Sequence, residues 1–298
     1  MFRESLVALP TPFREGRIDL DAFRSLVEEH VAKKTSGLVV CGTTGEASTL
    51  SDAEQRGLIT AAVRFSHGRI PVIAGVGTNC TETTIQTARF ANRCGADGVL
   101  VVTPYYCKPS RAGLIAHFSA VAEACKLPVV LYNVPSRTAC DLTPDIVSDI
   151  VARNSNVVAI KEVTNDRDRI RSLVSIEGLD VLCGEDTAIA DFAELGAQGV
   201  IGVVANVAPN EVAELWRAAA DGSRERREEL EGRIAPLLEA LYVESNPAPV
   251  KRALEVLGKI SSEVRLPLAA LSPASDLLVL GALKRFAQSP ARTPIETP

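Results

Sequence analysis

The sequence predicts an α/β fold, a (β/α)8 TIM barrel with a small C-terminal helical appendix. Short apolar runs alternate eight times with longer segments of 3.6-residue periodicity. The apolar runs show no polar alternation, which is typical of strands buried on both faces of a parallel sheet. The chain has 298 residues, a length that suits one such barrel. Eight βα units in one chain therefore indicate a closed barrel.

The predicted strands are residues 5–9, 37–41, 71–75, 98–102, 128–132, 157–161, 180–183 and 199–204. The predicted helices that follow them are residues 20–32, 52–66, 82–94, 111–125, 144–151, 166–176, 187–195 and 210–220. The residues suited to cap these helices at their N-termini are Asp19, Ser51, Thr81, Ser110, Thr143 and Asp186. A doubly wound sheet is the alternative fold, but no Gly-x-Gly-x-x-Gly motif follows the first strand.

After Ala220 the pattern changes to helices alone, predicted at residues 224–242, 249–257 and 275–285. We assign residues 1–221 to the catalytic barrel and residues 222–298 to the helical appendix. The last residues, from 289 onward, are expected to fray.

The composition excludes several classes of protein. The 32 Lys and Arg against 37 Asp and Glu give a net charge of −5 without a basic block, which argues against a nucleic-acid partner. No window approaches a membrane span and no secretory signal is recognised, so we expect a cytoplasmic protein. The seven dispersed cysteines indicate reduced thiols. The three histidines lie far apart, which argues against a metal site, and we expect His30 and His67 on the surface at helix ends.

Two polar residues end neighbouring buried strands. Lys161 ends the run 157–160, Tyr132 ends the run 128–131, and Arg137 follows Tyr132 closely. The carboxyl ends of barrel strands face the active site, so these side chains are candidates for one cleft. A desolvated lysine can lose its proton and attack carbonyl groups. A solvated or paired lysine at the end of the strand, without a catalytic role, would give the same sequence pattern.

Two loops at the same end of the predicted barrel carry further candidates. The segment Gly42-Thr43-Thr44-Gly45-Glu46 can direct backbone N–H groups and two hydroxyls at an anion, although an ordinary turn would have the same composition. The loop at residues 103–109 holds Tyr105 and Tyr106 and is more aromatic than an average solvent loop.

The chain resembles the dihydrodipicolinate synthases (4-hydroxy-tetrahydrodipicolinate synthases), within the N-acetylneuraminate lyase superfamily of pyruvate-dependent class I aldolases. The matching pieces are ALPTPF (8–13), GTTGE (42–46), PYY (104–106), YNVPSRT (132–138), IKE (160–162), ANVAP (205–209) and SNP (245–247). Their order and placement cover nearly the whole chain. The resemblance implies a lyase that condenses pyruvate with L-aspartate 4-semialdehyde to 4-hydroxy-tetrahydrodipicolinate, in lysine and diaminopimelate biosynthesis, with no metal or other cofactor.

The resemblance also implies roles for individual residues. Lys161 would form an imine with pyruvate, and Tyr132 would be the general acid and base beside it. Thr43 and Thr44 would hold the pyruvate carboxylate, with Thr43 also in a proton relay. Tyr106 would join that relay.

Two further implications concern the pyruvate pocket and the assembly. Ile201 would line the pocket through its backbone, although a buried side chain on the last strand explains its residue type equally well. Tyr106 would reach into the site of the neighbouring subunit of a homotetramer built from tight dimers.

Arg137 favours the synthase branch, in which this arginine holds the acidic group of the aldehyde. A salt bridge within its loop would explain the same residue without a role in substrate binding. Cys107, Gly202 and Val204 depart from the usual family pattern around the pocket. A lyase that uses a sugar-acid aldehyde therefore stays open, as does a keto-acid-binding paralogue without activity.

We also predict weak or absent inhibition by lysine. Gln55 and Thr83 stand where lysine-sensitive members tend to carry a histidine or an acid. The neighbouring Glu82 is rotated by roughly 100° from Thr83 on a helix and should point elsewhere.

Overall fold

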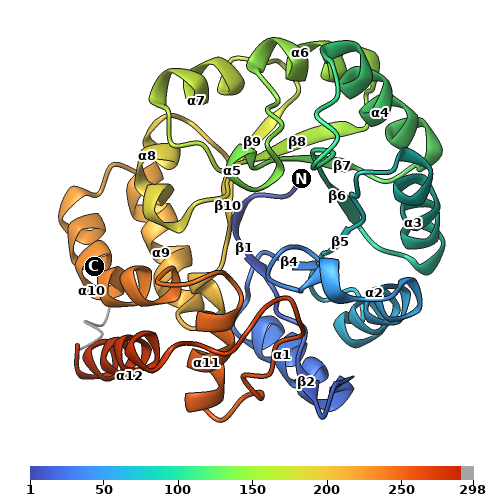
Figure 1. Ribbon diagram of the computed structural model, residues 1–298. Helices are drawn as coiled ribbons and strands as arrows, with labels where there is room; N and C mark the ends of the chain where they lie inside the picture. Colours follow the sequence, from blue (N-terminus) through green and yellow to red (C-terminus); the bar gives the residue numbers. More distant parts are fainter. Residues whose placement is uncertain (290–298) are drawn as a thin grey trace.

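Eight parallel strands close into a barrel in the computed structural model, which describes residues 1–289 (Figure 1). The strands are β1 (Glu4–Ala8), β4 (Gly37–Val40), β5 (Val72–Gly75), β6 (Gly98–Val102), β7 (Val129–Asn133), β8 (Val157–Glu162), β9 (Asp180–Cys183) and β10 (Gly199–Gly202). They are hydrogen-bonded in chain order, and β1 closes the ring by pairing with both β4 and β10. The predicted barrel is confirmed. A small hairpin of β2 (Phe13–Arg14) and β3 (Arg17–Ile18) adds a feature that the sequence analysis did not predict.

Helices surround the barrel on its outside. Those of the βα units are α1 (Leu20–Ala32), α2 (Asp52–Ser66), α3 (Thr81–Cys94), α4 (Arg111–Ala124), α6 (Pro144–Arg153), α7 (Arg167–Val174), α8 (Ile189–Glu194) and α9 (Pro209–Ala220). A further one-turn helix, α5 (Pro135–Thr138), follows β7 and was not predicted. The short 3₁₀ helices are η1 (Ala47–Thr49), η2 (Asp186–Ala188) and η3 (Val204–Asn206).

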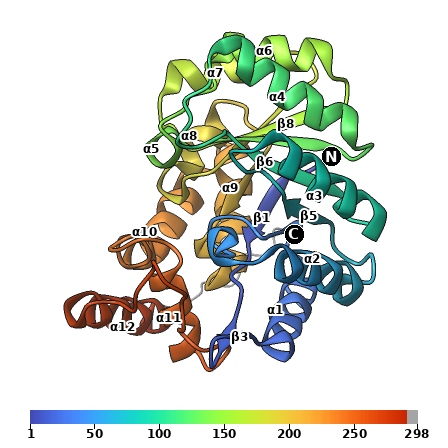
Figure 2. The same ribbon diagram turned by 45° about the vertical axis from the view of Figure 1, so that its right-hand side comes forward.

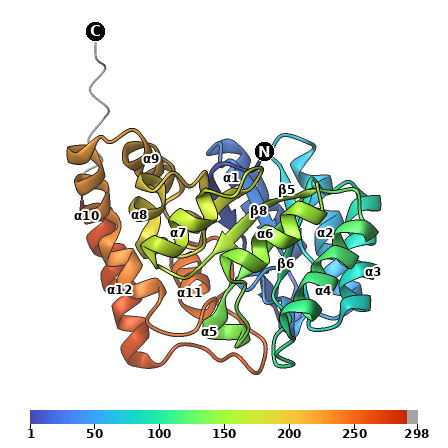
Figure 3. The same cartoon turned by 90° about the horizontal axis from the view of Figure 1, so that it is seen from above.

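Three later helices lie together at one side of the barrel, beside α9 (Figures 1 and 2). They are α10 (Arg224–Leu241), α11 (Ala248–Val256) and α12 (Pro273–Gln288). Seen along the perpendicular direction, α5 and the segment between α11 and α12 lie at one end of the barrel, and the N-terminus lies at the opposite end (Figure 3). The final part of the predicted appendix, residues 290–298, lies outside the described residues, and so does the predicted fraying there.

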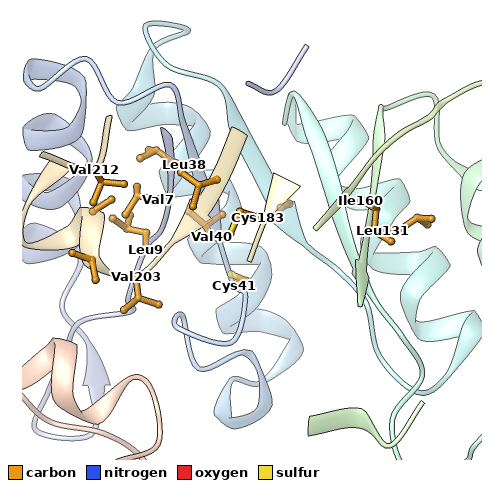
Figure 4. Packing of buried hydrophobic residues seen from close by; sticks show 14 of the residues in the cluster. Val7, Leu9, Leu38, Val40, Cys41, Leu131, Ile160, Cys183, Val203 and Val212 are labelled. Carbon is orange, nitrogen blue, oxygen red and sulfur yellow. The ribbon is translucent and has the colours of Figure 1, made fainter. Parts of the chain in front are cut away.

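The strands are buried on both faces, which explains why their sequences lack polar alternation. Leu6 and Ile201 belong to the cluster inside the barrel, whereas Val7 of the same strand as Leu6 belongs to the layer between strands and helices. Figure 4 shows part of this outer layer, where Leu131 and Ile160 of neighbouring strands lie side by side. Each strand therefore contributes alternate residues to two apolar layers.

Three of the six predicted capping residues cap their helices through the side chain. The side chains of Asp19, Ser51 and Ser110 accept backbone hydrogen bonds at the N-termini of α1, α2 and α4. Thr143 occupies the N-cap position of α6 without a capping hydrogen bond from its side chain. The prediction for Thr81 was wrong, because Cys80 is the N-cap and Thr81 is already helical.

Asp186 was predicted as a helix cap but lies within η2 instead. Its Oδ2 accepts the backbone N–H groups of Val203 (2.7 Å) and Val204 (3.1 Å). Because these amides donate to a carboxylate, the chain leaves the sheet after Gly202, two residues earlier than predicted.

The prediction that His30 lies on the surface was also wrong. It is 2% exposed, and its Nδ1 is 2.9 Å from the Thr35 hydroxyl. Burial lowers its pKa to about 4. His67, by contrast, is exposed at the C-terminus of α2, as expected. Among residues 1–289, every helix is too short or too polar to cross a lipid bilayer.

Candidate active site

Lys161 and Tyr132 lie next to each other at the carboxyl ends of β8 and β7. They are direct partners in the parallel register, and only 7% and 6% of their surfaces are exposed. The Lys161 Nζ lies 4.6 Å from the centroid of the Tyr132 ring. The structure therefore places a primary amine in a largely dry site, within reach of a phenol.

Gly184, directly after β9, makes room for this lysine. A Cβ atom at Gly184 would lie 2.9 Å from Lys161 Cε and 3.0 Å from the Glu162 carbonyl oxygen. The next residue, Glu185, is partly buried, and burial raises the pKa of its carboxyl group, with nearby Asp186 adding to the rise and Lys161 opposing it. Gly184 was not predicted as a site residue, although a glycine at the end of a barrel strand was the available signal.

The loop after β4 carries Thr43 and Thr44 and is hydrogen-bonded to distant segments of the chain. Thr44 is 2% exposed, and its hydroxyl oxygen accepts a hydrogen bond from Asn246 Nδ2 at 2.9 Å. The Thr11 hydroxyl donates to the Gly45 carbonyl oxygen at 2.6 Å. Thr43 is partly exposed. The Thr44 hydroxyl is thus fixed by a residue of the C-terminal region.

The same loop ends in a buried ion pair. Lys251 Nζ lies 2.6 Å from Glu46 Oε1, and neither side chain has any exposed surface. The other carboxylate oxygen of Glu46 accepts the backbone N–H of Arg265 at 3.1 Å, and Lys251 Nζ lies 4.3 Å from the centroid of the Phe13 ring. Burial lowers the pKa of Lys251, although Glu46 opposes the shift. Glu46 itself has a left-handed backbone with φ 55°.

Arg137 and Tyr106 are both exposed and do not reach the buried part of the site in a single chain. Arg137 lies on α5, directly after the strand that carries Tyr132. Tyr106 is 89% exposed with φ 74°, and its backbone N–H donates to the Thr138 carbonyl oxygen at 3.4 Å. The loop after β6 is therefore attached to α5.

Ile201 is fully buried inside the barrel, where β10 pairs with β1. The next residue, Gly202, could not carry a Cβ atom without a clash, since the atom would lie 2.1 Å from Asp186 Oδ1. The Tyr242 hydroxyl donates to Asp186 Oδ2 at 2.6 Å. Burial, together with Asp186, raises the pKa of Tyr242 well above its usual range. The glycine at position 202, which departs from the usual family pattern, thus leaves room for the Asp186 carboxylate outside the barrel wall.

Residues 1–289 contain no group of three or more His, Cys, Asp or Glu side chains that could hold a metal ion. All seven cysteines are free thiols.

Residues 1–285 match the model of the Dihydrodipicolinate synthetase family. The chain belongs to this family. It is 44% identical over 288 residues to the 4-hydroxy-tetrahydrodipicolinate synthase of Geotalea daltonii, an alignment that covers 96% of this chain and 99% of that protein.

Solved structures of the dihydrodipicolinate synthetase family have the same fold. Dihydrodipicolinate synthase from Aquifex aeolicus superimposes with a TM-score of 0.94 at 42% identity, covering 97% of this chain and 99% of that one. The chloride-inhibited enzyme from Acinetobacter baumannii, in complex with pyruvate, gives a TM-score of 0.93 at 40% identity, covering 96% and 99%.

Proposed function

We propose that the protein is a Schiff-base lyase of the class I aldolase type that condenses pyruvate with L-aspartate 4-semialdehyde to 4-hydroxy-tetrahydrodipicolinate. The names of its relatives support this reaction. The observation that carries the proposal is the buried Lys161 amine against the Tyr132 ring. Such an amine is a nucleophile toward a ketone once it is unprotonated.

The chemistry begins when Lys161 Nζ attacks the pyruvate ketone, and loss of water leaves an imine. The imine nitrogen withdraws electrons, so a proton can leave the methyl group and an enamine forms. The enamine carbon then attacks the aldehyde carbon and makes the new C–C bond, and the aldehyde oxygen takes up a proton. The amino group of the second substrate then attacks the imine carbon, which closes the ring and releases Lys161. Tyr132, whose ring adjoins Lys161, is positioned to carry protons between these steps. Because the imine supplies the electron sink, we expect no metal requirement.

The remaining site residues bind the substrates. Thr43 and Thr44 are assigned to the pyruvate carboxylate, and Thr43 also to proton transfer. The fixed hydroxyl of Thr44 supports this assignment. Ile201 is assigned to the lining of the pyruvate pocket through its backbone, and its burial inside the barrel supports this assignment. Arg137 is assigned to the acidic group of the aldehyde, because a guanidinium can bind a carboxylate through two hydrogen bonds.

We further propose a homotetramer of tight dimers, in which Tyr106 completes the proton relay of the adjacent subunit. In the single chain Tyr106 is 89% exposed, so its side chain is free to enter the site of an adjacent subunit. A cytoplasmic location remains a prediction, supported by seven free cysteines.

Borohydride trapping tests the imine. Reduction in the presence of pyruvate should add one reduced pyruvyl group per chain and inactivate the enzyme. Lys161→Ala should abolish the adduct, whereas Lys126→Ala, which changes an exposed lysine, should not. An adduct on the Lys161→Ala variant would refute the assignment.

The aldehyde is tested separately with a substrate panel. The purified enzyme is given pyruvate with aspartate semialdehyde or with sugar-acid aldehydes, and the products are identified. A clear preference for a sugar-acid aldehyde would replace the synthase assignment and leave the imine chemistry intact.

A further inference from the structure

A buried polar network covers the outer faces of the two strands that carry Tyr132 and Lys161. Side chains alternate along a strand, so the next residues, Asn133 and Glu162, point away from the barrel interior. Both are fully buried and are partners in the register. Asn133 Nδ2 donates to both carboxylate oxygens of Glu162, at 3.2 Å and 3.0 Å. A hydrogen bond thus joins β7 and β8 directly behind the reacting groups.

Arg169 on α7 connects this pair to a third segment. Its Nε donates to Glu162 Oε2 at 2.9 Å, and its two terminal nitrogens donate to the two oxygens of Asp141, at 3.0 Å and 2.8 Å. Asn133 Nδ2 also lies 2.9 Å from Asp141 Oδ1. The Arg169 side chain is 12% exposed and that of Glu162 is fully buried, so water competes little for the hydrogen bond between them.

The segment that Asp141 anchors is the loop that carries Arg137. This loop leaves β7 at Asn133 and returns to it, because the backbone N–H of Leu142 donates to Asn133 Oδ1 at 2.9 Å. Arg169 also donates to the Leu142 carbonyl oxygen. Both ends of the loop are therefore fixed to β7, β8 and α7.

The two halves of the site depend on this network to different degrees. Lys161 is held by β8, which is hydrogen-bonded to strands on both sides. Arg137 is exposed and lies on a helix of four residues, whose position depends on the buried hydrogen bond between Thr103 and Thr138 and on the ends of the loop. Loss of an anchor should therefore displace Arg137 more than Lys161.

We propose that Asp141 and Arg169 are specificity-determining positioning residues, which place Arg137 for the acidic group of the aldehyde without taking part in imine formation at Lys161. The proposal rests on the proposed function of Arg137. It concerns the second substrate only, and this restriction separates it from a general structural role.

The test is the Asp141→Ala variant, since Asp141 is 40% exposed and its loss leaves the Arg169–Glu162 pair in place. At saturating pyruvate, KM for aspartate semialdehyde should rise on the order of tenfold, because misplacement by about 1 Å is enough for such losses. KM for pyruvate should change less than about twofold, and borohydride trapping should remain complete. The matched control is Asp145→Ala, which removes an exposed carboxylate that pairs with Arg111 outside this network and should leave both KM values unchanged.

A double-mutant cycle with Arg137→Ala decides whether Asp141 acts through Arg137. In the Arg137→Ala background, Asp141→Ala should have no further effect on the aldehyde KM, because the residue that it positions is gone. Independent, multiplying effects would overturn the proposal, and so would an equal rise of both KM values or an unchanged aldehyde KM. If Asp141→Ala fails to fold, Asp141→Asn takes its place, since it keeps an acceptor for Arg169 and removes the charge.

Failure of the proposed function would look different. A wild-type enzyme that forms the pyruvate imine but does not consume aspartate semialdehyde would refute the proposed aldehyde. The same cycle, measured with the acidic aldehyde that it does use, would then support or overturn the positioning role.

Discussion

Lys251→Met should destabilise the protein strongly, because it leaves the Glu46 carboxylate without its cation in a site closed to water. At the observed 2.6 Å, Coulomb's law with an effective dielectric constant of about 20 gives about 6 kcal/mol of attraction. Part of that attraction offsets the desolvation of the two charges. Breaking a buried pair from one side typically costs about 3–5 kcal/mol, and we expect a loss in this range.

The assay is equilibrium unfolding in urea at fixed protein concentration, for Lys251→Met, Glu46→Gln and the double variant. The double variant should be more stable than Lys251→Met alone, because it removes the unpaired charge. The control is Arg224→Met, which breaks an exposed pair with Glu228 and should cause no measurable change. A Lys251→Met variant as stable as this control, or a double variant less stable than Lys251→Met, would refute the reasoning.

Three further predictions concern pH, the aldehyde and regulation. Burial lowers the pKa of His30 and His117 to about 4 in the folded protein, against about 6.5 when unfolded. The unfolded state therefore binds more protons between these values, so stability is full above about pH 6.5 and falls by on the order of 2–3 kcal/mol per histidine as the pH drops to 4. Unfolding between pH 4 and 7 should show a flatter profile for His30→Gln. Arg137→Ala should lower kcat/KM for aspartate semialdehyde by roughly 10- to 150-fold, as loss of a charged hydrogen bond worth about 1.5–3 kcal/mol requires, while borohydride trapping with pyruvate persists. Millimolar lysine should inhibit the initial rate weakly or not at all, because Gln55 and Thr83 provide no carboxylate for its ammonium group.

Each of these has a contrary outcome. An unchanged pH profile in the His30→Gln variant would mean that folding does not shift the pKa of this histidine. Equal damage to trapping and condensation in Arg137→Ala would show that Arg137 serves pyruvate or the fold. Strong, saturable inhibition by lysine would point to Glu82, which is exposed and accepts a hydrogen bond from Gln86 at 3.0 Å.

The barrel could be predicted because its signal is local. A strand buried on two faces leaves an unbroken apolar run, and Lys161 and Tyr132 stood out because each ended such a run. His30 was misplaced although its spacing from the buried Phe23 and Val27 follows a helical face, a pattern that was available in the sequence. Its position at a helix end with charged neighbours outweighed that signal.

The supports of the site could not be predicted in the same way, because their partners are distant in the sequence. Lys251 and Glu46 are 205 residues apart, and Arg169 and Asp141 are 28 apart. Each of these charged residues, taken alone, is of a type that is usually found on the solvated surface. Only the closed fold shows that these charges are paired and that Lys251, Glu46 and Arg169 are largely removed from water.

The attachment of the C-terminal helices to the loop after β4 limits how this barrel can be divided or recombined. Asn246 supplies the donor to Thr44, and Lys251 supplies the countercharge to Glu46. A chain cut after residue 221 would keep every strand of the barrel and lose both partners. Such a fragment would have to solvate or protonate Glu46, so its loop would rearrange. Protein engineers who exchange barrels between members of this family should therefore exchange the C-terminal helices together with them.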